Sequence, residues 1–366
     1  MEHVTHDDSG VGRQDRLFSR ASDTCSACWA CIRHCPTHAI RSVDGAVSIA
    51  YERCVKCGAC VTECGSGTYT VRDDTPALRA LLAEEKPVVA LLASEYIAAL
   101  HPRRIAEVEA GLEAMGFSAV ETTVLGEELV AAAYEQVHAR TDSLLPRLRS
   151  TCPVTVEWVQ RFYPELTGAL VPLVPPYVAQ TRLIRELYAG EVAVAYVSPC
   201  WARKDEVLGD ELPGAPDVAV GFDELERLLA ENPAPRTHGT VPRRPHAAKQ
   251  LSGTDGFPRR TLFESTLADR DVVTVRGLHD VDRLLAAIVR GETAPGVVDM
   301  LCCEGCIDGP AVNRSLSVFA KRTIDAAERE RQPPPAVDSR TLLSALPAVP
   351  LARRFDPSPT LRREPT

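Results

Sequence analysis

Two cysteine runs near the N-terminus have a spacing that suits iron chemistry. Residues 25–36 read Cys-x2-Cys-x2-Cys-x3-Cys-Pro, and residues 54–64 repeat this order without the proline. Three thiolates two residues apart can bind three irons of one cubane 4Fe-4S cluster, whereas the displaced fourth cysteine binds the other cluster. The spacing therefore predicts one cluster on Cys25, Cys28, Cys31 and Cys64, and a second on Cys54, Cys57, Cys60 and Cys35.

Zinc and disulfide bonds are the alternative uses for these cysteines. Zinc sites usually pair two Cys-x2-Cys units at longer separations, and disulfides are rare in a reducing compartment. The N-terminus is acidic and polar, unlike a signal peptide, and no apolar run approaches the roughly 18 residues of a membrane span. We therefore expect a cytoplasmic protein whose cysteines bind metal.

Residues 21–70 resemble a two-cluster bacterial ferredoxin along the whole segment. The resemblance implies a small α+β domain that has no catalytic group and carries single electrons at low potential. Gly58 is expected to let the backbone approach a cluster sulfur closely. Gly65 stands where a second proline is expected, and this should alter the turn without altering ligation.

Five further cysteines lie in three distant segments, and several follow a predicted strand: they are Cys152, Cys200, Cys302, Cys303 and Cys306. Apolar runs predict strands at 86–93, 118–126, 191–200, 271–277 and 296–303. Helical periodicity predicts helices at 103–117, 127–140, 221–232 and 278–292. This alternation favours an α/β architecture with mainly parallel strands. Because loops at the carboxyl ends of such strands gather together, these cysteines could converge on one cluster. Buried apolar cysteines are the alternative.

The three segments resemble, in the same order, the three cysteine motifs in the catalytic domain of iron-only hydrogenases. The resemblance covers about residues 85–320 and implies a two-lobed α/β domain with a third 4Fe-4S cluster. It implies that Cys152, Cys200 and Cys306 are ligands, and Cys306 matches the cysteine that bridges to a two-iron subsite in the hydrogenases. The fourth ligand is Cys302 by the Cys-x3-Cys spacing, or Cys303 by the local sequence.

Residues beside these cysteines depart from the hydrogenase pattern. Thr151 stands where active hydrogenases carry a free cysteine that passes protons, and a threonine hydroxyl does not titrate near neutral pH. Arg203 replaces a lysine that holds a cyanide ligand of the subsite, and it keeps the charge but not the point-like donor. Glu206 matches the acidic residue of the same motif. We therefore expect the cubane ligands to survive while proton delivery and subsite contacts are eroded.

The sequence divides into four expected segments: a polar tail (1–20), a ferredoxin domain (21–72), a hydrogenase-like domain (85–325) and a Pro/Arg-rich C-terminal extension (326–366). Residues 232–260, rich in Pro, Gly and Arg, should form a long loop. The net charge of −9 argues against non-specific binding of nucleic acid. No GxGxxG motif follows a strand, so no nucleotide site is indicated.

The leading hypothesis is an electron-transfer protein that carries three 4Fe-4S clusters and exchanges electrons with a redox partner protein. One alternative is a slow or sensory iron-only hydrogenase with a two-iron subsite. Another is a non-catalytic regulator that responds to redox state or oxygen. No catalytic residue is assigned, and oxidoreductase activity is a possibility that the sequence leaves open.

Overall fold

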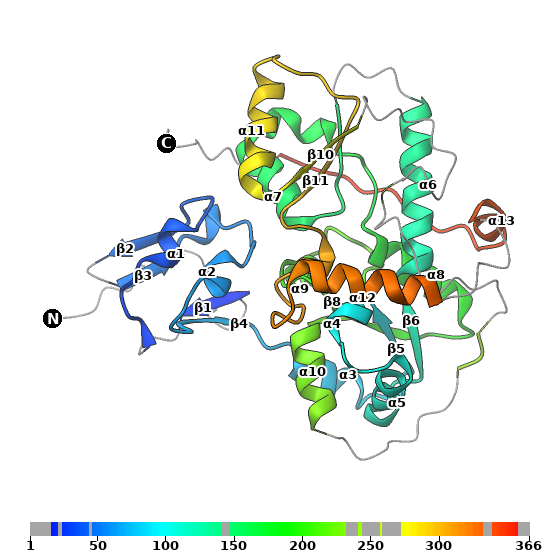
Figure 1. Cartoon of the computed structure of the whole chain (residues 1–366). Helices are drawn as coiled ribbons and strands as arrows, with labels where there is room; N and C mark the ends of the chain where they lie inside the picture. The colour runs from blue at the N-terminus through cyan, green and yellow to red at the C-terminus, as the bar shows by residue number, and fades with distance from the viewer. Residues whose placement is uncertain are drawn as a thin grey trace. The chain divides into compact units, whose positions relative to one another are not determined.

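The computed structural model describes residues 16–20, 24–43, 46–140, 146–231, 241–243, 257, 272–331 and 339–357 (Figure 1). The chain divides into two compact units, and the boundary falls between Asp73 and Asp74.

The N-terminal unit is built from two antiparallel strand pairs and very short helices. Its elements are β1 (Phe18–Arg20), α1 (Ala30–Arg33), β2 (Ile40–Val43), β3 (Ala46–Ile49), η2 (Tyr51–Arg53), α2 (Ala59–Thr62) and β4 (Tyr69–Val71). β1 pairs with β4, and β2 pairs with β3. α1 and α2 occupy equivalent places, because each begins just before the third cysteine of its run.

The larger sheet of the second unit has four parallel strands. In spatial order they are β6 (Ala119–Thr122), β5 (Val88–Leu92), β8 (Ala193–Ser198) and β9 (Val218–Gly221). Every residue of β5, β8 and β9 is buried, as in parallel sheets that helices cover on both faces. The helices of this lobe are α3 (Thr75–Leu81), α4 (Tyr96–Ala99), α5 (Ile105–Met115), α6 (Val124–Arg140), α8 (Pro176–Leu187), α9 (Ala202–Leu208) and α10 (Phe222–Ala230).

A second parallel sheet forms the other lobe of this unit. Its strands, in spatial order, are β10 (Val272–Arg276), β11 (Val297–Leu301) and β7 (Arg147–Leu148). The central strand, β11, is buried throughout. The accompanying helical elements are α7 (Pro153–Phe162), η3 (Pro164–Ala169), α11 (Leu278–Val289) and η5 (Cys306–Asp308).

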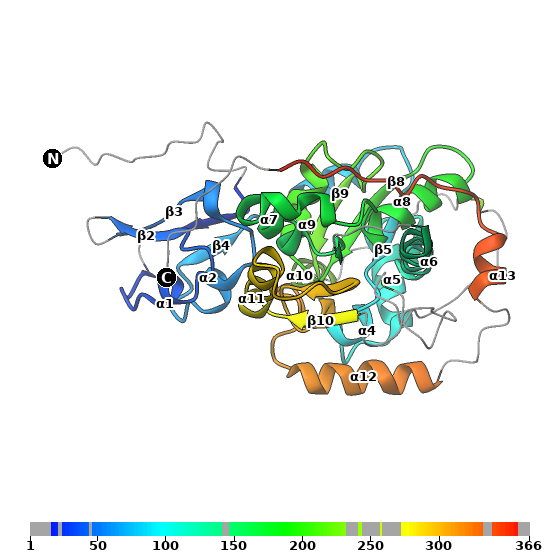
Figure 2. The same cartoon turned by 90° about the horizontal axis from the view of Figure 1, so that it is seen from above.

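The C-terminal part of the chain returns across the second unit. α12 (Val318–Arg331), orange in Figure 1, packs on α4 and contacts η5. After α13 (Ser339–Ser344), residues 349–357 form an extended segment, which we call the C-terminal strap. Ala352 of the strap bridges Leu173 in antiparallel fashion, and the Leu351 carbonyl accepts the Val174 N–H at 2.9 Å. Figure 2 shows the strap, in red, running along one side of the unit.

The expected α/β architecture with mainly parallel strands is confirmed. α5 ends at Gly116, whose φ of 108° gives a left-handed C-terminal cap. The strand expected at 118–126 is shorter, because the apolar pair Val124–Leu125 forms the first turn of α6 rather than the end of β6. Apolar runs alone do not separate these two states.

Most of the expected loop at 232–260 lies outside the described residues. Residue 326, the expected start of the C-terminal extension, lies within α12. Among the helices in the described parts of the chain, none is long and apolar enough to cross a membrane.

Candidate iron–sulfur sites

The first candidate site is a cavity in the N-terminal unit that combines cysteines of both runs: Cys25, Cys28, Cys31 and Cys64. The Cys64 sulfur accepts the backbone N–H of Thr68 at 3.3 Å and lies 3.4 Å from the Ser66 hydroxyl. Partial burial raises the pKa of Cys64, but the hydrogen bonds from Ser66 and Thr68 outweigh it and lower the pKa to about 7. This sulfur is therefore prepared to be a thiolate, the form that binds metal.

The second cavity groups the complementary four cysteines: Cys54, Cys57, Cys60 and Cys35. The Cys35 sulfur accepts the Ala39 N–H at 3.2 Å and lies 3.5 Å from the Thr37 hydroxyl, which repeats the pattern at Cys64. In both cavities, the last cysteine of one run lies with the first three of the other. This is the grouping that crossed ligation of two clusters requires.

The turns after the two runs are alike. Gly67 donates its N–H to the Cys64 carbonyl at 3.1 Å, and His38 donates to the Cys35 carbonyl at 3.2 Å. The expected change of the turn at Gly65 is therefore absent from this hydrogen-bond pattern. The reason is that the turn is set by the backbone bond, which proline at the second position favours but does not require.

Three positions in each half of the repeat adopt the left-handed backbone conformation: Ala27, Trp29 and His38, and in the second half Lys56, Gly58 and Gly67. Their φ values lie between 51° and 80°. An L-residue pays roughly 1–2 kcal/mol for this conformation, and four of the six are not glycine. Backbone N–H groups around such turns form concavities that bind anions. A cluster with four thiolate ligands is an anion, so the strained turns suit cluster binding.

The thiols of the second cavity resist ionisation in the absence of a cation. Burial raises the pKa of Cys57 to about 12, and the neighbouring Cys54 adds to the rise. Burial also raises the pKa of Cys60, again with a contribution from Cys54. Four thiolates can share this space only when a cationic centre offsets their repulsion, which a bound iron centre provides.

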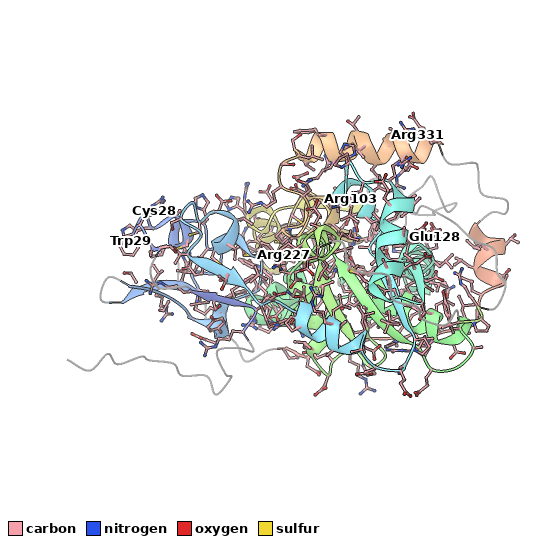
Figure 3. The ribbon with its side chains drawn as sticks, turned by 90° about the horizontal axis from the view of Figure 1, so that it is seen from below. Cys28, Trp29, Arg103, Glu128, Arg227 and Arg331 are labelled. Carbon is pink, nitrogen blue, oxygen red and sulfur yellow. The ribbon has the colours of Figure 1, made fainter. Side chains whose placement is uncertain are left out.

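Trp29 and Cys28 lie next to each other at the surface of the N-terminal unit (Figure 3). Both line the first cavity, and Trp29 is 37% exposed. The backbone N–H of Ala30 and the Ser26 hydroxyl lower the pKa of the exposed Cys28 thiol. The indole therefore packs beside the first cavity without sealing it.

A single metal ion does not match the spacing of these side chains. Thiolates around one zinc ion sit about 2.3 Å from the metal, and so within about 4 Å of one another. No three His, Cys, Asp or Glu side chains come together in this way among the residues that the structure describes. The cysteines surround a space instead, as ligands of a multi-iron group do.

The second unit brings the remaining cysteines together from three segments. Cys152 caps the start of α7, shortly after β7, and Cys200 follows β8 by two residues. Cys303 follows β11, and Cys306 opens η5. The loops therefore leave the carboxyl ends of parallel strands, where ligand-binding loops of open α/β sheets gather.

The thiols of this third site interact with one another. Burial raises the pKa of Cys200 to about 11, and Cys152 adds to the rise. Burial is the main cause that raises the pKa of Cys303 well above its ordinary value. Electrostatic interactions with Cys306, Cys152 and Cys200 add to the rise. Cys303 thus interacts electrostatically with the other three thiols, which makes Cys303 a candidate for the fourth member of the group.

Thr151 is buried beside Cys152, and its hydroxyl is held by a cation. The hydroxyl oxygen accepts the Nε–H of Arg149 at 2.6 Å. Arg149 in turn lies 2.7 Å from the Asp299 carboxylate, whose other oxygen lies 2.6 Å from Arg276. Burial would raise the pKa of Asp299, but the two guanidinium groups hold it below its usual value. Asp299 is therefore held ionised, and arginine and threonine side chains do not act as proton carriers near neutral pH.

Arg203 and Glu206 belong to a second buried network, which contacts the Thr151 backbone. Arg203 Nη2 donates to the Thr151 carbonyl at 3.2 Å, and its guanidinium stacks over the Tyr177 ring at 4.9 Å. Glu206 accepts the Tyr177 hydroxyl at 2.9 Å and Nη1 of Arg353 at 2.8 Å. Sequence reasoning missed Arg353, as it missed Arg149 and Asp299, because none of them stands in a recognisable motif.

A larger cavity, of about 810 Å³, lies away from the cysteines between α4, α5, β6 and α12. Its lining includes Tyr96, Leu100, Ile105, Glu121, Gln180 and Arg331, and no cysteine among the described residues. Its walls carry both charges, and they offer no sulfur ligand. The cysteine sites, although smaller, are therefore the candidates for binding an iron–sulfur cluster.

Two family models match this chain. Residues 18–65 match the family model for a 4Fe-4S dicluster domain. Residues 86–237 match the model for the C-terminal domain of the iron-only hydrogenase large subunit. A search of curated proteins found no match.

Solved FeFe-hydrogenases have a similar fold. A variant of HydA1 from Chlamydomonas reinhardtii is 15% identical, with a TM-score of 0.54 over 78% of this chain and 99% of that chain. A HydA structure solved in work on stepwise H-cluster assembly is 16% identical, with a TM-score of 0.53 over the same shares. A FeFe-hydrogenase from work on oxygen inactivation is 15% identical, with a TM-score of 0.52 over 74% of this chain and 93% of that chain. At sequence identities this low, the similarity shows a shared fold only.

The fold and the cysteine sites together define a hydrogenase-like iron–sulfur protein. More particularly, residues 86–237 are similar to the C-terminal domain of the iron-only hydrogenase large subunit, and residues 18–65, ahead of that region, are similar to a 4Fe-4S dicluster domain.

Proposed function

We propose that this protein holds three 4Fe-4S clusters and transfers electrons to or from a redox partner protein in the cytoplasm, without efficient turnover of hydrogen. Two clusters belong to the N-terminal cavities with the crossed ligand sets given above. The third is held by Cys152, Cys200, Cys303 and Cys306. The electrostatic interaction of Cys303 with the other three thiols supports this set.

The environment of Thr151 carries the proposal that hydrogen turnover is inefficient. Hydrogen chemistry needs a group that gives and takes protons near the reacting metal, with a pKa near the working pH. The Thr151 hydroxyl accepts a hydrogen bond from Arg149, which is fixed in turn by Asp299. Arginine does not release its proton, and Asp299 stays ionised. A permanent ion pair therefore occupies the place where a proton relay would begin.

A two-iron subsite is the basis of the alternative, a slow or sensory hydrogenase. Nε and Nη1 of Arg203 are buried and donate no hydrogen bond to the residues that the structure describes. Such donors beside Cys306 could receive an anionic ligand of a subsite. The residues thus offer one bridging sulfur and one cation for this group, but no thiol at position 151.

Infrared spectroscopy of protein produced anaerobically together with hydrogenase maturation enzymes separates the two functions. The proposal expects no bands from iron-bound carbon monoxide or cyanide, and roughly twelve irons per chain, since each cubane cluster contains four. Observation of those bands would contradict the proposal and would support the hydrogenase alternative. An iron content of about eight per chain would mean that only two clusters are bound, which would contradict the proposed third cluster. Cys200→Ser should lower the iron content to about eight, and Cys302→Ser should not.

A further inference from the structure

We propose that Arg353 of the C-terminal strap neutralises Glu206, so that the charge of Arg203 acts on the third cluster and raises its reduction potential. This inference rests on the proposed function, because it requires a cluster at the third site. It makes the strap, far along the chain from the cysteines, a determinant of the direction of electron flow.

The backbone and side chain of Arg203 are both tied to ligand loops. Its N–H donates to the Cys200 carbonyl at 3.3 Å. Its Nη2 donates at 3.2 Å to the carbonyl of Thr151, the residue before Cys152. The side chain is almost fully buried, and it interacts electrostatically with Cys306. The guanidinium therefore stands among cysteines of all three segments, where little water screens its charge.

Arg203 is not the closest partner of Glu206. Nη1 of Arg203 lies 4.0 Å from the Glu206 carboxylate, beyond hydrogen-bond distance. Arg353 lies closer, at 2.8 Å, and its side chain is only 3% exposed. Glu206 takes its other hydrogen bond from the neutral Tyr177 hydroxyl. Two guanidinium groups thus share one buried carboxylate, and the trio of Arg203, Glu206 and Arg353 has a net charge of +1.

In the part of the chain that the structure describes, the groups next to this trio do not cancel its charge. Burial raises the pKa values of Tyr177 and Tyr196 well above neutral, so both phenols stay uncharged. Glu211 lies 3.5 Å from Arg353, but it is 73% exposed and contributes little. Glu95 interacts with Tyr196, but it is only partly buried, so water screens it. The net positive charge of Arg203, Glu206 and Arg353 therefore acts on the thiolates of the third site.

The unpaired donors of Arg203 point to the same role. A buried N–H without an acceptor costs about 1–3 kcal/mol, so such groups are normally satisfied. Nε and Nη1 of Arg203 find no acceptor among the described residues, and the thiolates and sulfides of a cluster are acceptors. Hydrogen bonds to sulfur and nearby positive charge both favour the reduced, more negative cluster. They raise its reduction potential for that reason.

The strap holds Arg353 through its backbone. The Arg353 N–H donates to the Pro172 carbonyl at 3.0 Å, next to the bridge between Ala352 and Leu173. These contacts do not involve the guanidinium, so its charge can be removed while the strap stays attached. The adjacent Arg354 is exposed and provides a matched control.

Redox titration of the full-length, cluster-loaded protein, followed by electron paramagnetic resonance, tests the inference. The third-cluster signal is the one that Cys200→Ser removes. Arg203→Gln and Arg353→Gln should each lower its midpoint potential, whereas Glu206→Gln should raise it. Arg354→Gln should leave it unchanged. A purely structural role would not make the midpoint potential fall when a positive charge is removed and rise when a negative charge is removed.

The inference is overturned if Arg353→Gln shifts the potential no more than Arg354→Gln, or if Glu206→Gln shifts it downwards. Should Arg203→Gln fail to bind the third cluster, the opposite shifts of Glu206→Gln and Arg353→Gln decide the question by themselves. A wild-type protein with no third-cluster signal would contradict the proposed function. A third cluster whose potential ignores these charges would contradict this inference alone.

Discussion

Gly309 lies directly against the carbonyl oxygen of Pro199, so that a Cβ on Gly309 would come within 2.1 Å of that oxygen. Pro199 precedes Cys200, and Gly309 follows Cys306 by three residues. The Ala311 N–H also donates to the Pro199 carbonyl, at 3.1 Å. The absence of a side chain at Gly309 therefore allows two ligand loops of the third site to meet.

Gly309→Ala should push these loops apart and weaken the third site. Because the obstacle is backbone rather than a flexible side chain, one of the loops must move. We expect iron content to fall from about twelve to about eight per chain, with the signals of the N-terminal clusters retained. Gly168→Ala is the control, since a Cβ there meets nothing within 4 Å. Full iron content in Gly309→Ala would contradict the expectation.

Crossed ligation in the N-terminal unit predicts which substitutions are equivalent. Cys64→Ser should remove the same cluster signal as Cys28→Ser, because both residues line the first cavity. Cys35→Ser should match Cys57→Ser, because both line the second. Electron paramagnetic resonance of the reduced variants compares the pairs. If Cys35→Ser matched Cys28→Ser instead, each run would hold its own cluster.

The left-handed conformation of Lys56 predicts a stabilising substitution. Lys56→Gly removes steric strain at a φ of 60° and should raise the urea midpoint of the N-terminal unit. Loss of visible absorbance on anaerobic unfolding reports the midpoint. Ser48→Gly, in the exposed strand position opposite Arg41, should lower it, since glycine weakens an ordinary strand. An unchanged or lower midpoint for Lys56→Gly would show that the strain is not relieved.

The buried carboxylate of Asp299 predicts a large and pH-independent loss of stability. Asp299→Asn leaves the charges of Arg149 and Arg276 without their anion, which should cost on the order of 3–5 kcal/mol. Asp280→Asn is the control, because its pair with Arg283 is exposed and should contribute less than about 1 kcal/mol. Urea midpoints of the variants and the wild type give the differences.

The sign of the pH effect follows from the lowered pKa of Asp299 in the folded protein. Its stabilising contribution is fully present above the unfolded-state pKa of about 3.9, and it is lost only as the pH falls through the lower folded-state pKa. The difference between wild type and Asp299→Asn should therefore stay constant from about pH 8 to pH 5. A difference that shrinks within this window would mean that Asp299 titrates at a higher pH.

Much of the fold could be read from local patterns. The buried strand β5 and the helix that ends at Gly116 follow from an apolar run and from helical periodicity with a glycine stop. The boundary between β6 and α6 could not, because Val124 and Leu125 suit a strand end and a buried helical turn equally. Only the packing of the completed sheet separates these two states.

The sequence by itself determined the character of the N-terminal unit. Its eight cysteines lie in two short runs, where a few backbone torsions set the positions of the sulfurs, so spacing alone points to the groups of four that line each cavity. The third site is different, because its sulfurs come from distant segments. Only the tertiary structure brought Cys303 into electrostatic interaction with the other thiols. It also formed the hydrogen bond from Arg149 to the Thr151 hydroxyl. It also brought Arg353 to Glu206 across 147 residues, a contact that depends on how the strap packs and leaves no trace in local sequence.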